Sequence, residues 1–444
     1  PRGFTDPVLV PGETIARSVH ITELREAVDA RRARCGLAAA AWTDPELGQG
    51  VTPIRAIHIS ELRTAVDEAH RACGAAPPAW TDPQIVPGVT PIKALHLMEL
   101  RSGAVSDVQN LPPQARRMLG AEILEVGGAA VDVNVSGHFG DPNGDALTYT
   151  ATSSNIGVVT TTVSNETIAL RPVGAGKATV TVTAVDPGGL GATKSLDVTV
   201  ALLHVDFDKT ALGEYTAAAF HADWPTAEWV IGLATGRAEV VEGAGAYAGR
   251  SLRLKYPAGT YGSRNQAIQS RIDLPRSYDE LYVSYRVRFD EAFDFVRGGK
   301  LPGLIGGEGN VGGNRPDGTD GWSGRMMWRR GGEAVQYLYH PDQPDIYGED
   351  FRWNRRFEPG RWHTVEHRFV MNTPRAHDGV LQAWFDGEQV LSVDNLRFRD
   401  VDSFAIDQFY VSTFFGGGDT TWAPAKDEYI AFDDIVITTT RIDQ

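Results

Sequence analysis

The sequence has 444 residues, a formal net charge of −15 at pH 7, 42% hydrophobic residues and 22% charged residues. This length exceeds what a single hydrophobic core supports, so we expect several domains. The acidic balance argues against nucleic acid as a general partner. There is no apolar run of eighteen residues, so we expect no membrane span. The sequence begins with Pro1 and shows no signal peptide, which is typical of a processed or trimmed chain.

Residues 1–108 contain three copies of a 38-residue repeat. The segment His-Ile-Thr-Glu-Leu-Arg at 20–25 recurs with small changes at 58–63 and 96–101. The apolar spacing predicts one amphipathic helix in each unit. Units of this size cannot bury a core alone, so we expect them to stack on one another. They resemble the short helical repeats of bacterial surface proteins, which implies attachment or self-assembly.

The repeats carry equivalent histidines and cysteines. His20, His58 and His96 have no second metal ligand three or four residues away, which favours a structural role near a helix start. Cys35 and Cys73 are candidates for a disulfide between repeats or between chains. They could equally be buried small residues, because equivalent positions in stacked helices usually lie too far apart to bond. Scarce cysteine, large size and repeats are typical of a secreted or bacterial cell-surface protein.

Residues 109–117 have the composition of a linker. Residues 118–200 show short runs of alternating apolar and polar residues, separated by turn residues. This pattern predicts a small immunoglobulin-like β-sandwich that acts as a spacer. The segments 139–149 and 185–189 resemble cadherin-like bacterial modules. Asp141, Asp145 and Asp186 are candidate ligands for a structural Ca²⁺. Aspartate in such turns is also favoured for backbone reasons alone.

Residues 202–444 contain many strand-like runs and no long amphipathic helix. This composition predicts a β-jelly roll with a concave face for an extended ligand. Asp206, Asp433 and Asp434, near the first and last strands, are a second candidate calcium site. The expected fold is therefore multidomain and mainly β, with N-terminal α-helical repeats, a central sandwich and a C-terminal jelly roll.

A hairpin within this domain has arms at 322–329 and 335–340, joined by residues 330–332. A three-residue loop with glycine in the left-handed region would place Arg325 opposite Tyr337 and Ser323 opposite Tyr339, all on one face. A two- or four-residue loop would separate the two pairs. Trp322 and Trp328 fall on the opposite face and are expected in the core. Lys300 is expected nearby in a short loop at 298–303, and Arg297, Arg329 and Arg330 add positive charge.

This set of side chains contains no carboxylate pair, which ordinary glycoside hydrolysis requires. Arginine and lysine can instead neutralise the carboxylate of a 4-linked uronic acid, and a tyrosine can then remove the C5 proton. Neighbouring cations are expected to favour the phenolate form. The pattern therefore indicates β-elimination.

The motifs around Lys300, Ser323-x-Arg325 and Tyr337-x-Tyr339 closely resemble polysaccharide lyase family 14, best known for alginate lyases. The resemblance covers nearly all of 202–444 and implies a β-jelly roll acting on an acidic polysaccharide, with no cofactor required for catalysis. It implies catalytic roles for Lys300, Ser323, Arg325, Tyr337 and Tyr339. Gln266, Gln269, Arg297 and His340 are candidate substrate contacts.

Two alternatives stay open at this point. In the first, the chain is a lyase specific for glucuronan or another polyuronate rather than for alginate. In a different class, the chain would be a surface adhesion or filament-forming protein whose lyase-like domain only binds glycan. The intact set of lysine, serine, arginine and tyrosines argues against binding alone, whereas the regular repeats keep assembly open.

Overall fold

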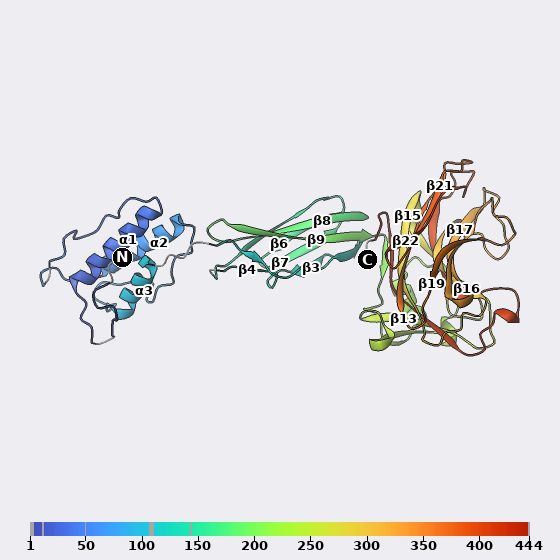
Figure 1. Cartoon of the computed structure of the whole chain (residues 1–444), viewed down its shortest axis with the longest axis horizontal. Coiled ribbons are helices and arrows are strands. Elements are labelled where there is room, and N and C mark those ends of the chain that lie inside the picture. The colour runs from blue at the N-terminus through green and yellow to red at the C-terminus, as the bar shows by residue number, and fades with distance from the viewer. Residues whose placement is uncertain (1–3, 11–12, 49, 106–110, 143, 443–444) are drawn as a thin grey trace.

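The computed structural model describes residues 4–10, 13–48, 50–105, 111–142 and 144–442. Three separate hydrophobic cores follow one another along an elongated molecule (Figure 1). The helical repeats form one end, a sandwich lies in the middle, and the largest body forms the other end. Within the described residues, no helix has the length and hydropathy needed to cross a membrane.

Each repeat contributes one helix to a shared core. The helices are α1 (Ser18–Arg34), α2 (Ala56–Ala72) and α3 (Ala94–Val105). The predicted stripe of Ile21, Leu24 and Val28 is fully buried, as are its equivalents in the second repeat. Every helix contacts both of the others. The units therefore stack in a closed ring rather than in an open row.

Arginine side chains join successive repeats around this ring. A guanidinium of each helix donates to two backbone carbonyls of the next repeat and lies over an aromatic ring there. The donors and acceptors are Arg25 to Thr43 and Asp44, Arg63 to Thr81 and Asp82, and Arg101 to Thr5 and Asp6. The last pair links the third repeat back to the first, which closes the ring.

The repeat histidines have a structural role, as predicted. His20 is fully buried, its Nδ1 accepts a hydrogen bond from the Arg17 amide at 3.2 Å, and its Nε2 lies 2.9 Å from an Asp6 carboxylate oxygen. His58 and His96 make the equivalent contacts in their own repeats. Each histidine therefore holds the turn that precedes its helix.

Cys35 and Cys73 form a disulfide between the first and second repeats, with their Cα atoms 5.1 Å apart. The expectation that equivalent helix positions lie too far apart to bond is wrong here. Both cysteines are C-cap residues, at the ends of α1 and α2, and these two ends converge in the ring.

The central sandwich packs a four-stranded sheet, in the order β2-β9-β8-β5, against a three-stranded sheet, in the order β3-β7-β6. The strands are β1 (Gln114–Ala115), β2 (Glu122–Glu125), β3 (Val131–Asn134), β4 (Phe139–Gly140), β5 (Thr148–Ser153), β6 (Val159–Ser164), β7 (Thr167–Pro172), β8 (Gly176–Val185) and β9 (Gly191–Ala201). Strand β1 lies in the segment assigned to the linker, yet it pairs with β4. The linker is therefore shorter than predicted, and its residues 109–110 lie outside the described part of the chain.

The sandwich packs directly on the C-terminal body. Only Leu202 separates β9 from β10 (Leu203–Val205), and its amide donates to the Ile437 carbonyl at 2.7 Å. Ala201, Val436 and Ile442 form a small apolar cluster at this junction. The sandwich and the C-terminal body therefore share a continuous strand path and an apolar contact.

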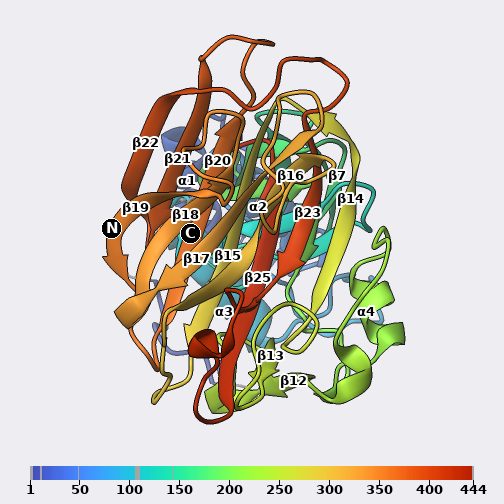
Figure 2. The same ribbon diagram turned by 90° about the vertical axis from the view of Figure 1, so that its right-hand side faces the viewer.

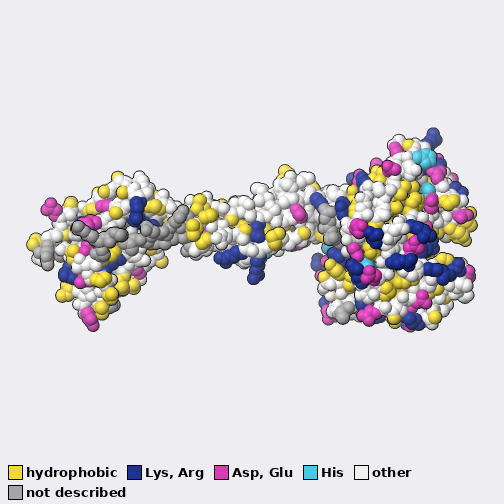
Figure 3. All heavy atoms as spheres, viewed as in Figure 1, with side chains coloured by type: hydrophobic (Ala, Val, Ile, Leu, Met, Phe, Trp, Pro, Cys, Tyr) yellow, Lys and Arg dark blue, Asp and Glu magenta, His cyan; other side chains and the backbone are white. Residues whose placement is uncertain are grey.

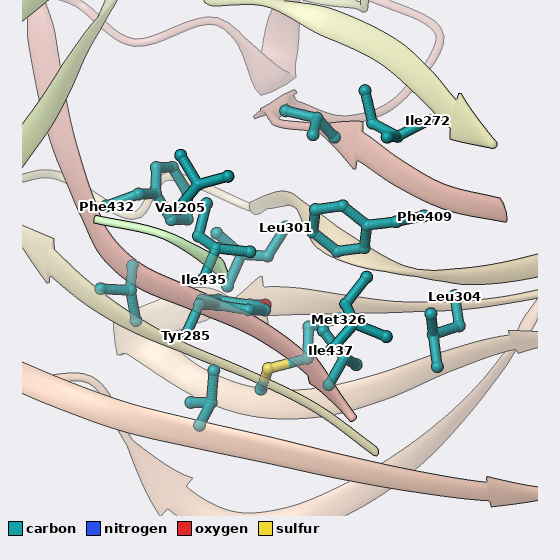
Figure 4. Packing of buried hydrophobic residues seen from close by; sticks show 14 of the residues in the cluster. Val205, Ile272, Tyr285, Leu301, Leu304, Met326, Phe409, Phe432, Ile435 and Ile437 are labelled. Carbon is teal, nitrogen blue, oxygen red and sulfur yellow. The ribbon is translucent and has the colours of Figure 1, made fainter. Parts of the chain in front are cut away.

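The C-terminal body consists of two sheets packed face to face, as in a jelly roll. One is nine-stranded, in the order β11-β12-β13-β25-β15-β20-β21-β22 with β10 beside β25, and the other is seven-stranded, in the order β14-β23-β16-β17-β18-β19 with β24 beside β16 (Figure 2). The core between them includes Leu301, Met326 and Phe409 from one sheet and Tyr285 and Ile437 from the other (Figure 4). In Figure 1 the nine-stranded sheet lies between the sandwich and the seven-stranded sheet, so the outer face of the latter points away from the repeats.

This body also contains a short helix, α4 (Ala217–Asp223), between β11 and β12. The early strands are β11 (Gly213–Glu214), β12 (Ala238–Glu242), β13 (Arg250–Tyr256), β14 (Gln269–Tyr278), β15 (Glu280–Phe289), β16 (Gly298–Gly307), β17 (Gly321–Arg329) and β18 (Glu333–Tyr339). The later strands are β19 (Glu349–Arg356), β20 (Trp362–Val370), β21 (Gly379–Phe385), β22 (Glu388–Leu396), β23 (Ile406–Ser412), β24 (Phe414–Phe415) and β25 (Glu428–Thr438).

Lys300 lies on a strand and not in the predicted loop. Strand β16 runs between β17 and β23 in the middle of its sheet. Its glycines allow close approach of neighbouring atoms, because a Cβ atom at Gly299 would lie 2.0 Å from the Trp328 ring and one at Gly303 would lie 2.2 Å from the Gly324 carbonyl oxygen. The glycine-rich sequence that suggested a loop therefore reflects tight packing in a strand.

Candidate active site

The hairpin has the predicted register. Arg325 pairs with Tyr337 and Ser323 pairs with Tyr339 across β17 and β18. The connecting residues 330–332 form a three-residue loop in which Gly331 and Gly332 have φ values of 63° and 78°. All four side chains therefore share one face of the sheet.

The opposite face of β17 packs into the core. Trp322, Met326 and Trp328 are fully buried between the two sheets, as the alternation predicts for both tryptophans. The face of the sheet that carries Arg325, Tyr337 and Tyr339 is called the reactive face below. Met327 lies on this face, where it forms a small separate apolar cluster with Val335 and the two tyrosines.

Lys300 reaches the same face because β16 contains a bulge. The pairing of β16 with β17 shifts between Leu301 and Gly303, so Leu301 and Leu304 both point into the core while Lys300 lies opposite Met327. The Lys300 ammonium contacts the Met327 sulfur and lies 3.5 Å from the centre of the Tyr337 ring. Burial, reinforced by the positive charge of Arg325, lowers the pKa of Lys300 well below its ordinary value.

Arg325 is 3% exposed, in the middle of the sheet face. Its guanidinium donates to the Ser412 hydroxyl at 3.2 Å and lies 5.3 Å from the centre of the Tyr410 ring. Within the described residues its Nε atom has no hydrogen-bond partner. Arg325 therefore keeps donor capacity for a ligand, although burial lowers its pKa.

The two tyrosines contact each other edge to face, with ring centres 5.6 Å apart. The Tyr339 hydroxyl oxygen accepts a hydrogen bond from the Gly313 amide at 3.0 Å. Burial and the neighbouring Tyr339 raise the pKa of Tyr337 above its ordinary value. The expectation that adjacent cations favour the phenolate is therefore wrong for Tyr337, because burial outweighs Arg325 and Arg329 there.

Ser323 is fully buried, and its hydroxyl donates to the Asn310 carbonyl at 2.6 Å. It is not among the side chains that line the cavity described next. In this structure Ser323 holds the segment after β16 in place rather than facing open space.

The reactive face lines a cavity of about 650 Å³, a size within the usual range for ligand sites. Its predicted members are Lys300, Arg325, Tyr337 and Tyr339, together with Gln269 and Arg329. The side chains that the sequence did not single out for this site include Met327, Tyr347, Tyr410, Phe414 and Trp422. Among the described residues that line the cavity, none is Asp or Glu. Alternation along β23 could have indicated Tyr410 as a cavity residue, because Tyr410 shares a face with Ser412, the hydrogen-bond partner of Arg325.

The two glutamines predicted to contact substrate differ in whether they reach the cavity. Gln269 lines the cavity and accepts a hydrogen bond from the Tyr410 hydroxyl at 2.8 Å. Gln266 is fully buried and bonds to the Thr260 carbonyl and the Phe415 amide, so it does not reach the cavity.

His340 and Arg297 also do not line the cavity directly. His340 is 4% exposed and bonds to Glu349 at 2.9 Å. Arg297 lies 4.8 Å from the centre of the Trp422 ring and donates to the Thr421 hydroxyl, so it supports a lining residue. Of the four predicted substrate contacts, only Gln269 therefore faces the cavity.

The predicted calcium ligands near the first and last strands have other partners. Asp434 accepts a hydrogen bond from Arg286 at 2.8 Å, and Asp433 accepts one from Ser251 at 2.7 Å. Burial raises the pKa of Asp433 to about 7. One Asp206 oxygen accepts from the Asp208 amide. The ion pair of Asp434 with Arg286 makes this set a poor fit to a calcium ion.

The three sandwich aspartates lie in one turn region. The pKa of Asp145 is raised by burial and by the charges of Asp141 and Asp186, so the three carboxylates lie near one another. No group of three or more His, Cys, Asp or Glu side chains with metal-binding geometry occurs in the described part of the chain, which leaves out Asn143. Calcium binding at this turn stays a prediction.

Comparison with known proteins gives a family match for part of the chain. Residues 245–435 match the family model described as Polysaccharide lyase 14. This range contains the whole reactive face and spans less than half of the chain. No curated protein matches the sequence.

Several solved structures are similar to the chain. The structure of alginate lyase Aly36B is 28% identical, with a TM-score of 0.47, and the match covers 55% of this chain and 98% of that one. The marine PL-14 alginate lyase from Aplysia kurodai is 24% identical, with a TM-score of 0.47 and coverage of 55% and 100%. The endo-beta-1,4-glucuronan lyase from Trichoderma reesei is 18% identical, with a TM-score of 0.35 and coverage of 49% and 92%.

Proposed function

We propose that the C-terminal body is a polysaccharide lyase that cleaves a 4-linked uronic-acid polymer, first of all alginate, by β-elimination. The observation that carries this proposal is the convergence of Lys300, Arg325, Tyr337 and Tyr339 on one cavity whose described lining contains no carboxylate. Cations suit an anionic polymer, and the absence of a carboxylate pair disfavours ordinary hydrolysis. The family match over residues 245–435 supports the same reaction class.

In this reaction a base removes the proton from C5 of a uronate unit, and the electron pair forms the C4–C5 double bond. The bond from C4 to the leaving oxygen breaks, and that oxygen takes a proton. Arg325 and Lys300 face the place where the uronate carboxylate would lie and stabilise the charge that develops there. The carboxylate favours the protonated form of Lys300, which opposes the effect of burial on its pKa.

The contacts of the two tyrosines favour different roles. The Gly313 amide donates to the Tyr339 oxygen and holds the phenol in position, so we assign Tyr339 as the base. The raised pKa of Tyr337 keeps its proton in place at neutral pH, so we assign Tyr337 as the donor to the leaving oxygen. Ser323 acts through the segment that contains Asn310 and is a positioning residue.

The test is the ultraviolet absorbance of unsaturated uronate ends after incubation with alginate, glucuronan or pectin. We expect the signal with alginate, and we expect Tyr339→Phe to reduce kcat by about 100-fold or more, the usual contribution of a general base. Tyr247→Phe is the matched control, because Tyr247 is 45% exposed and lies outside the cavity. A folded protein that releases no unsaturated product from any of the three polymers contradicts the proposal.

A signal with glucuronan alone identifies the second candidate substrate. Binding of polymer without cleavage, unchanged in Tyr339→Phe, supports the other class, a glycan-binding adhesion protein. The Cys35–Cys73 disulfide suits an oxidising compartment, which supports a secreted or cell-surface location. Residues 1–108 then serve attachment. Their helices α1, α2 and α3 lie at one end of the molecule, and the body that contains β16 and β17 lies at the other (Figure 1 and Figure 3).

A further inference from the structure

The cavity has two ends along the direction of β17. Ser323 and Met327 are four residues apart on this strand, a separation of about 13 Å at the usual rise per residue. Met327 lies opposite Lys300, and Ser323 lies opposite Tyr339. Lys300 and Tyr339 therefore lie at different points along β17, with the pair of Arg325 and Tyr337 between them.

An aromatic side chain marks each end of this site. At the Lys300 end, a Cβ atom at Gly416 would lie 3.8 Å from the lysine chain, and one at the adjacent Gly417 would lie 2.1 Å from the Trp422 ring. Trp422 therefore lies beyond Lys300.

The other end is defined by Tyr347. Gly348 packs against the Tyr339 ring, since a Cβ atom at Gly348 would lie 2.8 Å from it. The preceding residue, Tyr347, therefore lies next to Tyr339 at this end of the site. Gly313, whose amide bonds to Tyr339, would bring a Cβ atom within 3.4 Å of the Tyr347 ring. The two aromatic residues thus flank the reactive cluster on opposite sides, and both line the cavity.

Trp422 is held in place by its neighbours. It ends a short 3-10 turn (Thr420–Trp422) that the Asp419 carboxylate caps by accepting from the Thr421 amide at 2.9 Å. The Arg297 guanidinium donates to the Thr421 hydroxyl and lies 4.8 Å from the centre of the indole. A large ring fixed in this way loses little conformational entropy when a ligand packs on it.

Tyr347 is 58% exposed although its backbone is fixed. The fully buried Gln343 donates through Nε2 to the Asp345 carbonyl at 2.8 Å and to the Tyr347 carbonyl at 3.1 Å. An exposed aromatic ring on an ordered segment beside a cavity is a feature of binding sites.

We propose that Trp422 and Tyr347 bind the sugar rings that flank the reacting pair, one on each side of the reacting bond. The apolar faces of pyranose rings pack on aromatic side chains, while the carboxylates of the reacting units face Arg325 and Lys300. Rings bound on both sides suit an internal stretch of polymer, and the 58% exposed Tyr347 side chain leaves its end of the site accessible, so we expect endo cleavage. This inference rests on the proposed lyase function.

The kinetic test compares Trp422→Ala, Trp422→Phe, Tyr347→Ala and Tyr347→Phe on uronate oligosaccharides of increasing length. We expect each alanine variant to lose about tenfold in kcat/KM on hexasaccharide and polymer, the size of one good aromatic contact. The shortest cleaved oligosaccharide should be unaffected, and the phenylalanine variants should retain most of the activity. Tyr247→Ala is the matched exposed control.

The endo mode is tested by the viscosity of the polymer solution, which should fall before many unsaturated ends have formed. Alanine variants that match the wild type at every length would overturn the proposal, and so would viscosity that falls only in proportion to released ends. Unchanged melting temperatures separate loss of binding from loss of folding.

Binding to the cleavage-deficient Tyr339→Phe protein separates the two proposals. Calorimetry with a uronate hexasaccharide should show about tenfold weaker binding when Trp422→Ala or Tyr347→Ala is added. If the wild type releases no unsaturated product but this binding still depends on both aromatic residues, the binding sites stand and the lyase function fails. Binding that ignores both substitutions overturns the sites alone.

Discussion

The Lys300 ammonium lies 3.5 Å from the centre of the Tyr337 ring. Burial lowers the pKa of Lys300 and raises that of Tyr337, so it favours the neutral form of both groups. The contact therefore joins two buried groups that both favour the neutral form. In the proposed reaction, the carboxylate of a bound uronate would favour the charged form of Lys300.

Lys300→Met should stabilise the fold at neutral pH while it abolishes activity. A lowered pKa in the folded state means that the unfolded chain binds the proton more tightly, so the lysine lowers the free energy of unfolding at neutral pH. This cost diminishes as the pH rises toward about 10.4, the ordinary lysine pKa. The measurement is thermal unfolding of wild type and variant at several pH values.

Lys255→Met is the control for this prediction. The hydrogen bond with Asp427 raises the pKa of Lys255, so its removal should give no gain in stability. A Lys300→Met protein that is less stable than the wild type at neutral pH, or whose gain is the same at pH 7 and pH 10, would contradict the assignment of a buried lysine with a lowered pKa.

Gly303→Ala should disrupt the site from outside the cavity lining. The added Cβ atom would lie 2.2 Å from the Gly324 carbonyl oxygen and 2.6 Å from the Arg325 Cα atom, so β17 must move. We expect a loss of about 1–3 kcal/mol in unfolding free energy from this overpacking, together with a lower kcat. Gly120→Ala is the control, since a Cβ atom there meets nothing within 4 Å. Full activity in Gly303→Ala would show that Arg325 tolerates a shift of its strand.

The alternation of β17 and β18 made the central part of this site predictable. The odd-numbered loop at 330–332 determined the register, and the register placed Arg325 beside Tyr337. Lys300 was expected beside the hairpin, where it lies, but in a loop and not on a strand, because glycine and proline usually signal a loop. The bulge between Leu301 and Gly303 also defeats simple alternation, since Leu301 and Leu304 both point inward.

Other parts of the site depend on contacts that no local pattern reveals. Trp422 and Tyr347 lie in irregular segments, and only the tertiary fold brings them to the cavity. Gln266 and Gln269 look alike in the sequence, yet one is buried against backbone groups and the other faces the cavity. The phenol of Tyr337 was expected to respond to nearby charge, but the depth of its burial, which the sequence does not show, decides the direction.

Removal of divalent ions should leave the activity unchanged. The described cavity lining has no carboxylate, so the proposed chemistry uses tyrosine, lysine and arginine side chains. Calcium should act on the sandwich instead, where Asp145 lies close to Asp141 and Asp186. The measurement is lyase activity and thermal unfolding with EDTA or added calcium. A calcium-dependent rise in the melting temperature that Asp145→Asn removes would place the ion there, whereas loss of activity in EDTA would contradict the proposed mechanism.

Arg101→Ala should open the ring of repeats. Arg101 is 7% exposed and donates to the Thr5 and Asp6 carbonyls, which links the third repeat to the first. Loss of these charged hydrogen bonds should lower the stability of the helical unit by about 2–3 kcal/mol. Arg71→Ala is the control, because Arg71 is an exposed arginine on α2. The helical circular dichroism signal of the full chain, followed during heating, gives the comparison.

The same closure bears on assembly. In the wild type each repeat already contacts the two others. No repeat therefore has a free face that could pack on a repeat of a second molecule. Light scattering of the full chain should show a monomer at all concentrations. Arg101→Ala frees two carbonyls on the first repeat and should allow exchange of repeats between chains, seen as concentration-dependent dimers. Wild-type oligomers that disappear when residues 1–108 are removed would instead show that the closed ring itself presents an assembly surface.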